Sequence, residues 1–373
     1  MKKRHLSLIL SAALLLPGCG DQTNLEEQQM TLLLGLDVGK GDELRFYSVS
    51  PVFSPEASQK YNITGTYANT ARQARKRLDA MSIGSLVGGK VQNIVISKKL
   101  LQTKNVFVYL DSFFRDPKNE VNGIVMVVDG EVKDIVYMNM KDKGRPGVVL
   151  KEQVETSYEG RSTVRTTLQQ YHRQMLEPGV TPYLTQIKPG SNEIIVTGTA
   201  FLNHEGKYVT SVGLKESSLF LLMKKQLQRS IPVSFILPPD ILEDKKQKQV
   251  YRINLNIGSA KRKITTKVQQ GTFHFDIKLD IGVVVTERPF KFDSEKKGKQ
   301  FKKAVEIAVK KDCEEIIRKF QQHQIDPVGL GQYVQAFHYR EWKKVEKEWG
   351  KAFSKAKVTV TPKVKIMSYG VEK

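Results

Sequence analysis

The chain has 373 residues, a formal net charge of +21, 40% hydrophobic residues and 27% charged residues. This composition is globular and excludes a low-complexity protein, and the length favours two or three domains over a single core. Cys19 and Cys313 are the only cysteines, and Cys19 belongs to a processing signal, which excludes a disulfide within the chain.

The N-terminus carries the parts of a lipoprotein signal. The basic tip Lys2–Arg4 precedes the apolar run Leu6–Leu16, which is too short to cross a bilayer because a crossing needs ~20 apolar residues. In the motif Leu-Pro-Gly-Cys that follows, we expect cleavage after Gly18 and two acyl chains on the thiol of Cys19. The alternative is an ordinary signal peptide with a chance cysteine. We assign residues 1–18 to the signal peptide and 19–29 to a lipidated tether, with the mature chain outside the cytoplasm.

The positive charge has two interpretations. In an exported chain it argues against nucleic acid and favours an anionic membrane face or an anionic polymer, at roughly 1 kcal/mol per lysine near the surface. Lysines scattered over a solvated surface are the alternative.

Residues 30–190 are expected to form an N-terminal α/β region. Strands are predicted at Met30–Asp37, Leu44–Val49, Val91–Ile96, Asn122–Val128 and Val132–Tyr137. The first two should pair as a hairpin, and so should the last two, across Asp129-Gly130. Helices are predicted at Thr66–Met81, Leu100–Arg115 (a helix or a helix–strand unit) and Thr163–Leu176, before a proline-punctuated connector at Pro178–Pro189.

One segment of this region, Gly84–Lys90, matches the phosphate-binding loop GxxxxGK. That loop must follow a strand and open a helix, with Ser or Thr after its lysine. Here Val91 occupies that position, a helix precedes and a strand follows. We therefore reject nucleotide binding and assign the glycines to a helix exit.

Residues 191–373 are expected to form a C-terminal α/β region, with a further division near residue 240 left open. Strands are predicted at Glu193–Leu202, Tyr208–Val212, Val233–Leu237, Tyr251–Ile257, Phe273–Val283 and Val358–Ile366, and helices at Glu216–Gln228 and about Glu295–Gln322. The last three strands alternate between apolar and polar residues, which favours antiparallel pairing with one buried face. The expected fold class is α/β (α+β mixed), with several mixed or antiparallel sheets flanked by helices in three domains.

The segment after the long helix is the candidate functional surface. Asp326 can cap a new helix with Pro327 at its first position, and Gly329 and Gly331 allow close backbone approach. We predict partner docking by these four residues, and a tight helix entry between domains is the alternative. Further on, Trp342 and Trp349 are seven residues apart and can share a helical face, for which ordinary core packing is the bland explanation.

The sequence shows no catalytic or metal-binding pattern. The mature chain has five histidines, none at metal-ligand spacing, and no nucleophile elbow GxSxG. Asp276 and Asp280 could form a carboxylate pair, but Lys278 between them favours a solvated charged face. Cys313 is expected to be a semi-buried small hydrophobe. We therefore expect no enzyme activity, no metal and no cofactor.

Several segments together carry a family resemblance over nearly the whole chain. They are Leu16–Cys19, Leu33–Asp37, Phe114–Pro117, Val196–Phe201, Glu216–Met223, Ile325–Gly331, Trp342–Lys344 and the basic strand from Lys357. In these the chain resembles the Ger(x)C lipoproteins, the C-subunit family of spore nutrient-germinant receptors. It departs from the family in lacking a tryptophan after Cys19, and in Val328 and Leu330, where larger or aromatic residues are commoner. The departures leave open which receptor of the family this is.

The resemblance implies a non-enzymatic subunit anchored to the inner spore membrane by lipid on its outer side. It also implies integral-membrane A and B subunits as partners, nutrient-triggered germination as the function, and a three-domain α/β fold. It gives no ligand residues, because the germinant pocket is more usually assigned to the B subunit. A solute-binding lipoprotein of a transporter is the alternative, although such proteins have two doubly wound lobes. An envelope hydrolase is a third interpretation, and it lacks a site.

Overall fold

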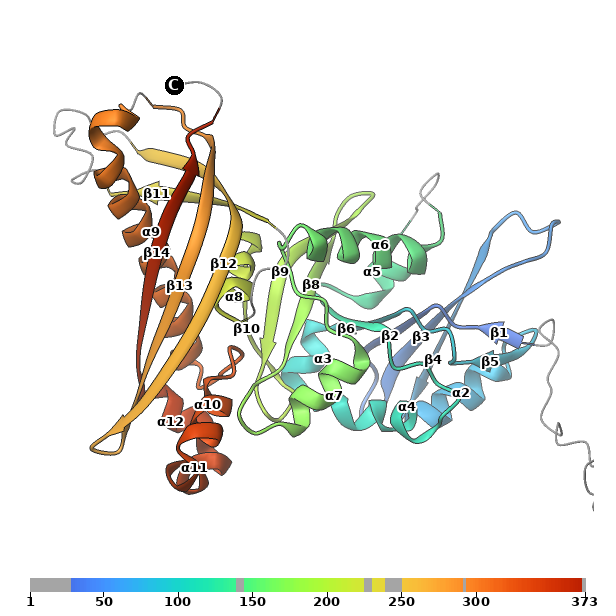
Figure 1. Ribbon diagram of the computed structural model, residues 1–373. Coiled ribbons are helices and arrows are strands. Elements are labelled where there is room, and N and C mark those ends of the chain that lie inside the picture. The colour runs from blue at the N-terminus through green and yellow to red at the C-terminus, as the bar shows by residue number, and fades with distance from the viewer. Residues whose placement is uncertain (1–27, 139–143, 225–229, 239–249, 291–292, 371–373) are drawn as a thin grey trace, which may run out of the picture.

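The structure is a computed structural model that describes residues 28–138, 144–224, 230–238, 250–290 and 293–370 (Figure 1). Two large sheets lie side by side, an eight-stranded sheet in the N-terminal half and a four-stranded sheet in the C-terminal half. A small parallel pair, β1 (Gln28–Met30) and β5 (Ser85–Val87), flanks the first sheet. The fold is therefore mixed α/β, as predicted.

The eight-stranded sheet is parallel in its centre and antiparallel at both sides. Its strand order is β10-β9-β8-β7-β6-β2-β3-β4, and β2, β6, β7 and β8 are the parallel strands. The strands are β2 (Leu33–Val38), β3 (Leu44–Pro51), β4 (Tyr61–Ala68), β6 (Asn93–Ser97), β7 (Ile124–Val128), β8 (Tyr183–Pro189), β9 (Ile194–Leu202) and β10 (Tyr208–Val212). The division at residue 190 stays a prediction, and the sheet itself continues past it through β9 and β10.

Helices cover both faces of this sheet (Figure 1). All residues of β6 and β7 are buried, and neighbouring residues alternate between two separate cores: Ile94 and Ile96 enter one, Val95 the other. A strand buried on both faces is typical of a parallel sheet. The first core is closed by α2 (Ala71–Asp79), α3 (Lys98–Thr103), η2 (Val106–Leu110), α4 (Asp111–Arg115) and α7 (Leu168–Leu176), and the second by α5 (Val132–Val136) and α6 (Pro146–Glu159).

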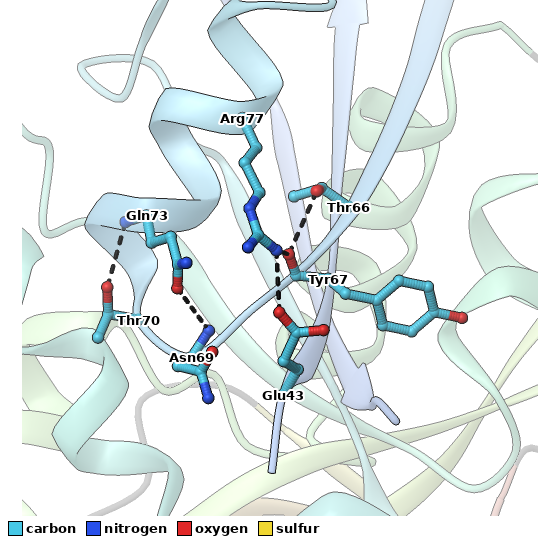
Figure 2. A network of polar contacts seen from close by, with 7 residues as sticks. All are labelled: Glu43, Thr66, Tyr67, Asn69, Thr70, Gln73 and Arg77. Atoms are coloured by element: carbon cyan, nitrogen blue, oxygen red, sulfur yellow. Dashed lines mark hydrogen bonds and ion pairs between the residues drawn. The ribbon is translucent and has the colours of Figure 1, made fainter. Parts of the chain in front are cut away.

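Helix α2 shows how polar side chains fix a helix on the sheet (Figure 2). The Thr70 hydroxyl accepts a hydrogen bond from the Gln73 N–H at 3.1 Å, and the Gln73 side chain accepts one from the Asn69 N–H at 2.9 Å. These reciprocal bonds satisfy N–H groups that a helix start leaves open. Arg77 in the last turn donates to Glu43 at 2.9 Å and to the Tyr67 carbonyl, which ties α2 to β4 and to the residue before β3.

The four-stranded sheet is covered on one face only. Its order is β11-β12-β13-β14, from β11 (Ile231–Leu237), β12 (Tyr251–Gln269), β13 (Thr272–Glu287) and β14 (Lys357–Ser368). A tight turn with positive φ at Gln270 and Gly271 joins β12 to β13. The covered face packs against α8 (Leu214–Lys224), α9 (Ser294–Gln322), α10 (Leu330–Phe337), α11 (Tyr339–Val345) and α12 (Trp349–Ser354), and the short η4 (Glu346–Glu348) joins the last two helices. The core under it also reaches the first sheet, because Phe201 of β9 packs on Phe320 with ring centroids 4.7 Å apart.

The outer edge of this sheet is closed by side chains of α9. Strand β14 has no neighbouring strand on that edge among the described residues. Glu306 of α9 instead accepts a hydrogen bond from the Val364 N–H at 2.9 Å, and Glu314 accepts one from the Val360 N–H at 3.2 Å. The free backbone groups of the edge thus bind a helix of the same chain.

Three of the predicted elements are wrong in type or pairing. Val132–Val136 is helix α5, not the second strand of a hairpin, because β7 is already paired on both sides by β6 and β8, and Asp37 binds the Val132 N–H at 2.7 Å. The connector Pro178–Pro189 contains the central strand β8. Strand β14 runs parallel to β13, because the long α9 returns the chain to the end of the sheet at which β13 begins.

Two predicted helices of the N-terminal region begin later than expected. The helix predicted at Thr66–Met81 begins at Ala71, because β4 extends to Ala68, and the helix predicted at Thr163–Leu176 begins at Leu168. The Thr163 hydroxyl donates to the Gly198 carbonyl at 2.6 Å, and Thr166 donates to the Tyr183 carbonyl at 2.8 Å. These residues are therefore held against β8 and β9. Thr167 then caps the helix through a capping box with Gln170.

Candidate functional site

Asp326 lies at the centre of the segment predicted to be functional, and its side chain is completely buried. One carboxylate oxygen accepts a hydrogen bond from the Gly329 N–H at 2.9 Å. The other accepts bonds from the Gly331 N–H at 2.8 Å and from Trp349 Nε1 at 2.9 Å. Burial raises the pKa of Asp326, while these donors act in the opposite direction. The buried carboxylate therefore holds the loop that contains Gly329 and Gly331 and the side chain of Trp349 in fixed positions.

The helix after Asp326 begins later than predicted. Helix α10 starts at Leu330 with Gly329 as its N-cap residue, at φ 83°, so Pro327 is not its first residue. The Asp326 carboxylate still binds an N–H group of the first helical turn, through Gly331. Gly329 is required because its left-handed backbone conformation disfavours other residues.

Gly331 permits a close approach between the two halves of the chain. A Cβ atom at Gly331 would lie 2.7 Å from Trp349 Nε1 and 2.9 Å from the Cα of Gly179, which precedes β8. A Cβ atom at Gly179 would lie 2.8 Å from the Gln332 nitrogen. The Thr181 N–H adds a hydrogen bond to the Asp326 carbonyl at 3.0 Å. The segment around Asp326 thus contacts the residues that lead into β8. We call this contact between the two halves of the chain the junction.

The four residues predicted to dock a partner are all buried, namely Asp326, Pro327, Gly329 and Gly331. Their contacts within the described chain hold the junction, which corresponds to the structural alternative. Docking stays a prediction, and direct contact would have to come from exposed neighbours. Of these, Phe337 is 69% exposed at the end of α10, and Tyr339 is 57% exposed at the start of α11.

Both tryptophans are buried in the C-terminal core. The rings of Trp342 and Trp349 lie 5.4 Å apart, and Phe273 lies 5.4 Å from Trp349. This agrees with core packing. Trp349 has the additional task of donating to Asp326.

Two cations of the junction were not identified from the sequence. Lys224 at the end of α8 donates to the Pro327 carbonyl at 2.6 Å and lies 4.8 Å from the Tyr183 ring centre. Arg262 of β12 donates to the carbonyls of Met223 and Lys224 and to the Tyr333 hydroxyl. Arg262 shares a strand face with the buried Ala260 and Ile264. The sequence pattern could have indicated Arg262, because a charged residue here occupies a position on the apolar face of an alternating strand.

The remaining chemical candidates fit structural roles. Asp276 pairs with Lys278 at 3.6 Å and accepts from Thr361 at 2.8 Å, on the uncovered face of the sheet. Cys313 is fully buried in α9, deeper than predicted, and burial raises the pKa of its thiol. Within the described ranges, no group of three His, Cys, Asp or Glu residues could hold a metal ion.

The lysines of the C-terminal sheet gather on its uncovered face. Cross-strand rows place Lys261 beside Asp280 and Lys363, and Lys263 beside Lys278. The basic face is defined by these exposed lysines of β12, β13 and β14, namely Lys261, Lys263, Lys267, Lys278, Lys357, Lys363 and Lys365. It also carries two acidic residues: Asp280 lies between Lys261 and Lys363, and Asp276 lies between two threonines of the neighbouring strands.

A mainly apolar cavity of about 330 Å³ lies between α2 and the first sheet. Leu34, Phe46 and Leu78 are among its lining residues. Leu86 and Gly88, from the segment that matches GxxxxGK, also reach it. That segment forms β5 rather than a strand-to-helix phosphate loop, in agreement with its rejection.

Gly18 and Cys19 lie outside the described residues, so the predicted cleavage and lipidation stay predictions. In the parts of the chain that the structure describes, no helix has the length and apolar character needed to cross a membrane.

Comparisons with known proteins place the whole chain among spore germination proteins. Residues 21–189 match the family described as spore germination protein N-terminal domain, and residues 197–370 match spore germination B3/GerAC like, C-terminal. Spore germination protein GerQC of Bacillus cereus is 21% identical, with 100% of this chain and 99% of the relative aligned. Spore germination protein A3 of Bacillus subtilis (strain 168) is also 21% identical over the same shares.

A solved structure has the same fold. The crystal structure of the GerBC protein superposes with a TM-score of 0.56 at 16% identity, covering 90% of this chain and 96% of that chain. Together with the two family matches, this identifies the chain as a member of the Ger(x)C family of spore germination proteins.

Proposed function

We propose that the protein is the lipid-anchored, non-enzymatic subunit of a membrane germinant receptor that spores need in order to germinate in response to nutrients. The supporting observation is the extent of the family match, which runs with a short gap from residue 21 to residue 370. Integral-membrane A and B subunits are the proposed partners, and the outer side of the inner spore membrane is the proposed location.

The lipid anchor is proposed at Cys19. The signal pattern before Cys19 supports it, and β1 begins at Gln28, only a short tether away. The basic face would add attraction to anionic headgroups, at roughly 1 kcal/mol for each lysine that approaches the surface. Together the two would hold the folded chain close to the membrane in which its partners lie.

The partner surface is proposed to include the exposed end of α10. Asp326 and Gly331 fix the position of this helix from inside, and Phe337 and Tyr339 are exposed beside it. Large exposed aromatic side chains are favoured in the centres of protein interfaces. The alternative of a solute-binding lipoprotein has less support, because the C-terminal sheet is covered on one face only and is not a doubly wound lobe.

The test is germination of spores that lack the gene, with nutrients and with a non-nutrient trigger that bypasses receptors. The proposal expects loss of response to one class of nutrients and an intact response to the bypass. An unchanged response to every nutrient in a strain without related receptor genes would overturn it.

A second test addresses the anchor. The Cys19→Ala variant should leave the membrane fraction, while Cys313→Ala, at the buried cysteine, should stay in it. Equal retention of both variants would contradict lipidation at Cys19.

A further inference from the structure

A small cavity of about 180 Å³ lies at the junction of the two halves, apart from the larger cavity beneath α2. Three cations line it: Arg173 from α7, Lys224 from α8 and Arg262 from β12. Gln174 and Tyr333 contribute further polar groups, and none of the described residues that line the cavity carries a carboxylate. Three positive groups from separate elements converge on one half-open cavity.

The cations have more donors than the protein uses. Lys224 has three N–H groups, and among the described residues its acceptors are the Pro327 carbonyl at 2.6 Å and the Val328 carbonyl at 3.5 Å. A guanidinium has five N–H groups, and Arg262 gives three bonds, to two carbonyls and to Tyr333. Each side chain therefore retains at least one donor after its bonds to the described residues are made.

Two further donors belong to α7. Gln174 is buried, and its side-chain oxygen accepts from the Tyr183 N–H at 3.2 Å, which leaves its NH₂ group for another partner. The exposed guanidinium of Arg173 donates no hydrogen bond to any residue that the structure describes. Arg173 is therefore free to close on a ligand from the solvent side.

The acids near the cavity do not balance its charge. Asp326 and Glu177 both favour the protonated form of Lys224. The Asp326 carboxylate, however, is already occupied by two backbone N–H groups and Trp349. Burial, reinforced by the charges of Arg262 and Arg173, lowers the pKa of Lys224 to about 8. An anion among these groups would relieve that repulsion.

We infer that this junction cavity binds a small oxyanion, a phosphate or a carboxylate group, through Arg173, Lys224 and Arg262. The volume suits such a ligand, because one water takes about 30 Å³ of liquid and a phosphate takes the room of a few waters. Bound there, the anion would link α7 and β8 of the first sheet to α8 and β12 of the C-terminal half. It would stabilise the contact between the two halves, and the size of this stabilisation would depend on the concentration of the anion in solution.

Titration of the full chain in detergent tests the inference, at constant ionic strength, with phosphate, acetate and chloride as separate probes. The heat of binding and the thermal midpoint are both measured. We expect saturable binding of phosphate or acetate and a rise in midpoint that chloride does not give. Arg173→Gln should weaken binding about tenfold, the value of one charge-assisted hydrogen bond. The matched control is Arg340→Gln, at an exposed arginine of α11 that does not line the cavity.

Two results would overturn the inference: equal effects of all three salts together with no Arg173-dependent binding of anionic lipid, or equal loss of binding in both arginine variants. Lys224→Gln is a second variant from inside the cavity and should also lose binding. A final arm replaces free phosphate with anionic phospholipid in mixed micelles. Arg173-dependent binding of lipid without binding of free phosphate would assign the site to a headgroup, while the reverse would assign it to a soluble anion.

Discussion

The two sheets of this protein solve the problem of burial in different ways. The eight-stranded sheet is covered on both faces, so consecutive residues of β6 and β7 all lie in cores. The four-stranded sheet is covered on one face, so β13 alternates between buried apolar residues and exposed lysine or aspartate. The central strands of the first sheet therefore contribute both faces to the core. The second sheet contributes one face to the core and exposes the other, which can carry charged residues.

The largest effects should come from charges placed at neighbouring positions of the two sheets. Val95→Asp and Ile96→Asp in β6 should each destabilise the protein by more than about 4 kcal/mol, because both positions bury the new carboxylate. In β13, Ile277→Asp should do the same, whereas Lys278→Asp should cost less than about 1 kcal/mol. Urea unfolding measures all four. If Val95→Asp left stability unchanged, the first sheet would not need both faces of β6 to be buried.

Asp326 joins the halves, and removing it should cost more than removing a simple helix cap. Asp326→Ala leaves three buried donors without an acceptor, each worth about 1–3 kcal/mol. We expect a loss of about 3 kcal/mol or more in urea unfolding, against about 1 kcal/mol for a cap alone. Trp349→Phe removes only one of the donors and should cost less. A loss near 1 kcal/mol for Asp326→Ala would mean that the junction is looser than the hydrogen bonds indicate.

Two glycine variants test whether the close contact of Gly331 with Trp349 and Gly179 requires a residue without a side chain. Gly331→Ala puts a methyl group 2.7 Å from Trp349 Nε1 and 2.9 Å from Gly179 Cα, and should cost about 1–3 kcal/mol. Gly258→Ala in β12 meets no atom within 4 Å and should be neutral or slightly stabilising. Thermal unfolding of both variants is the measurement, and equal midpoints would remove the argument for Gly331.

The junction should also depend on pH through Lys224. Its pKa is about 8 in the folded protein against a usual value of 10.5, so between these values the unfolded chain holds a proton that the folded chain has released. The contribution of Lys224 to stability should therefore rise as pH increases from 8 to 10.5. The urea midpoint of the protein minus that of Lys224→Met should grow over this range. A flat or falling difference would contradict a depressed pKa.

The smallest effect on stability should come from the basic face. Replacing Lys263, Lys278 and Lys363 together by glutamine should leave the urea midpoint nearly unchanged. Binding of the unlipidated chain to anionic vesicles should nevertheless fall, by roughly 1 kcal/mol for each lysine that contacts the surface. The same vesicles without anionic lipid provide the control. Undiminished vesicle binding by the triple variant would separate this face from any membrane role.

Elements with a strong local signal could be predicted from the sequence. The hairpin of β2 and β3, the long α9 and the alternation of β12 and β13 follow from periodicity and turn residues. Val132–Val136 was missed because Asp129-Gly130 suggests a hairpin, and only the pairing of β7 with β6 and β8 excludes one. Direction failed for β14 because alternation reports a half-exposed face and not the sense of the strand.

The candidate site could be predicted only in part. Asp326 and its glycines were recognisable within one segment, and a cap by Asp326 predicts the bond from the Gly329 N–H. The bond from Gly331 was not predicted, because the helix begins later than expected. The donor from Trp349, the contact with Gly179 and the cations Lys224 and Arg262 come from segments far apart in the chain. Such long-range meetings depend on the packing of whole elements, which a local pattern does not report.

The glutamates on the edge of β14 have a consequence for a protein held at high density on a surface. Strand β14 has twelve residues, and an open edge of that length could template the same strand of a neighbouring copy. Because Glu306 and Glu314 occupy two of its outward N–H groups, a second chain would first have to displace part of α9. We expect this arrangement to let many copies crowd on one membrane without nucleating aggregates.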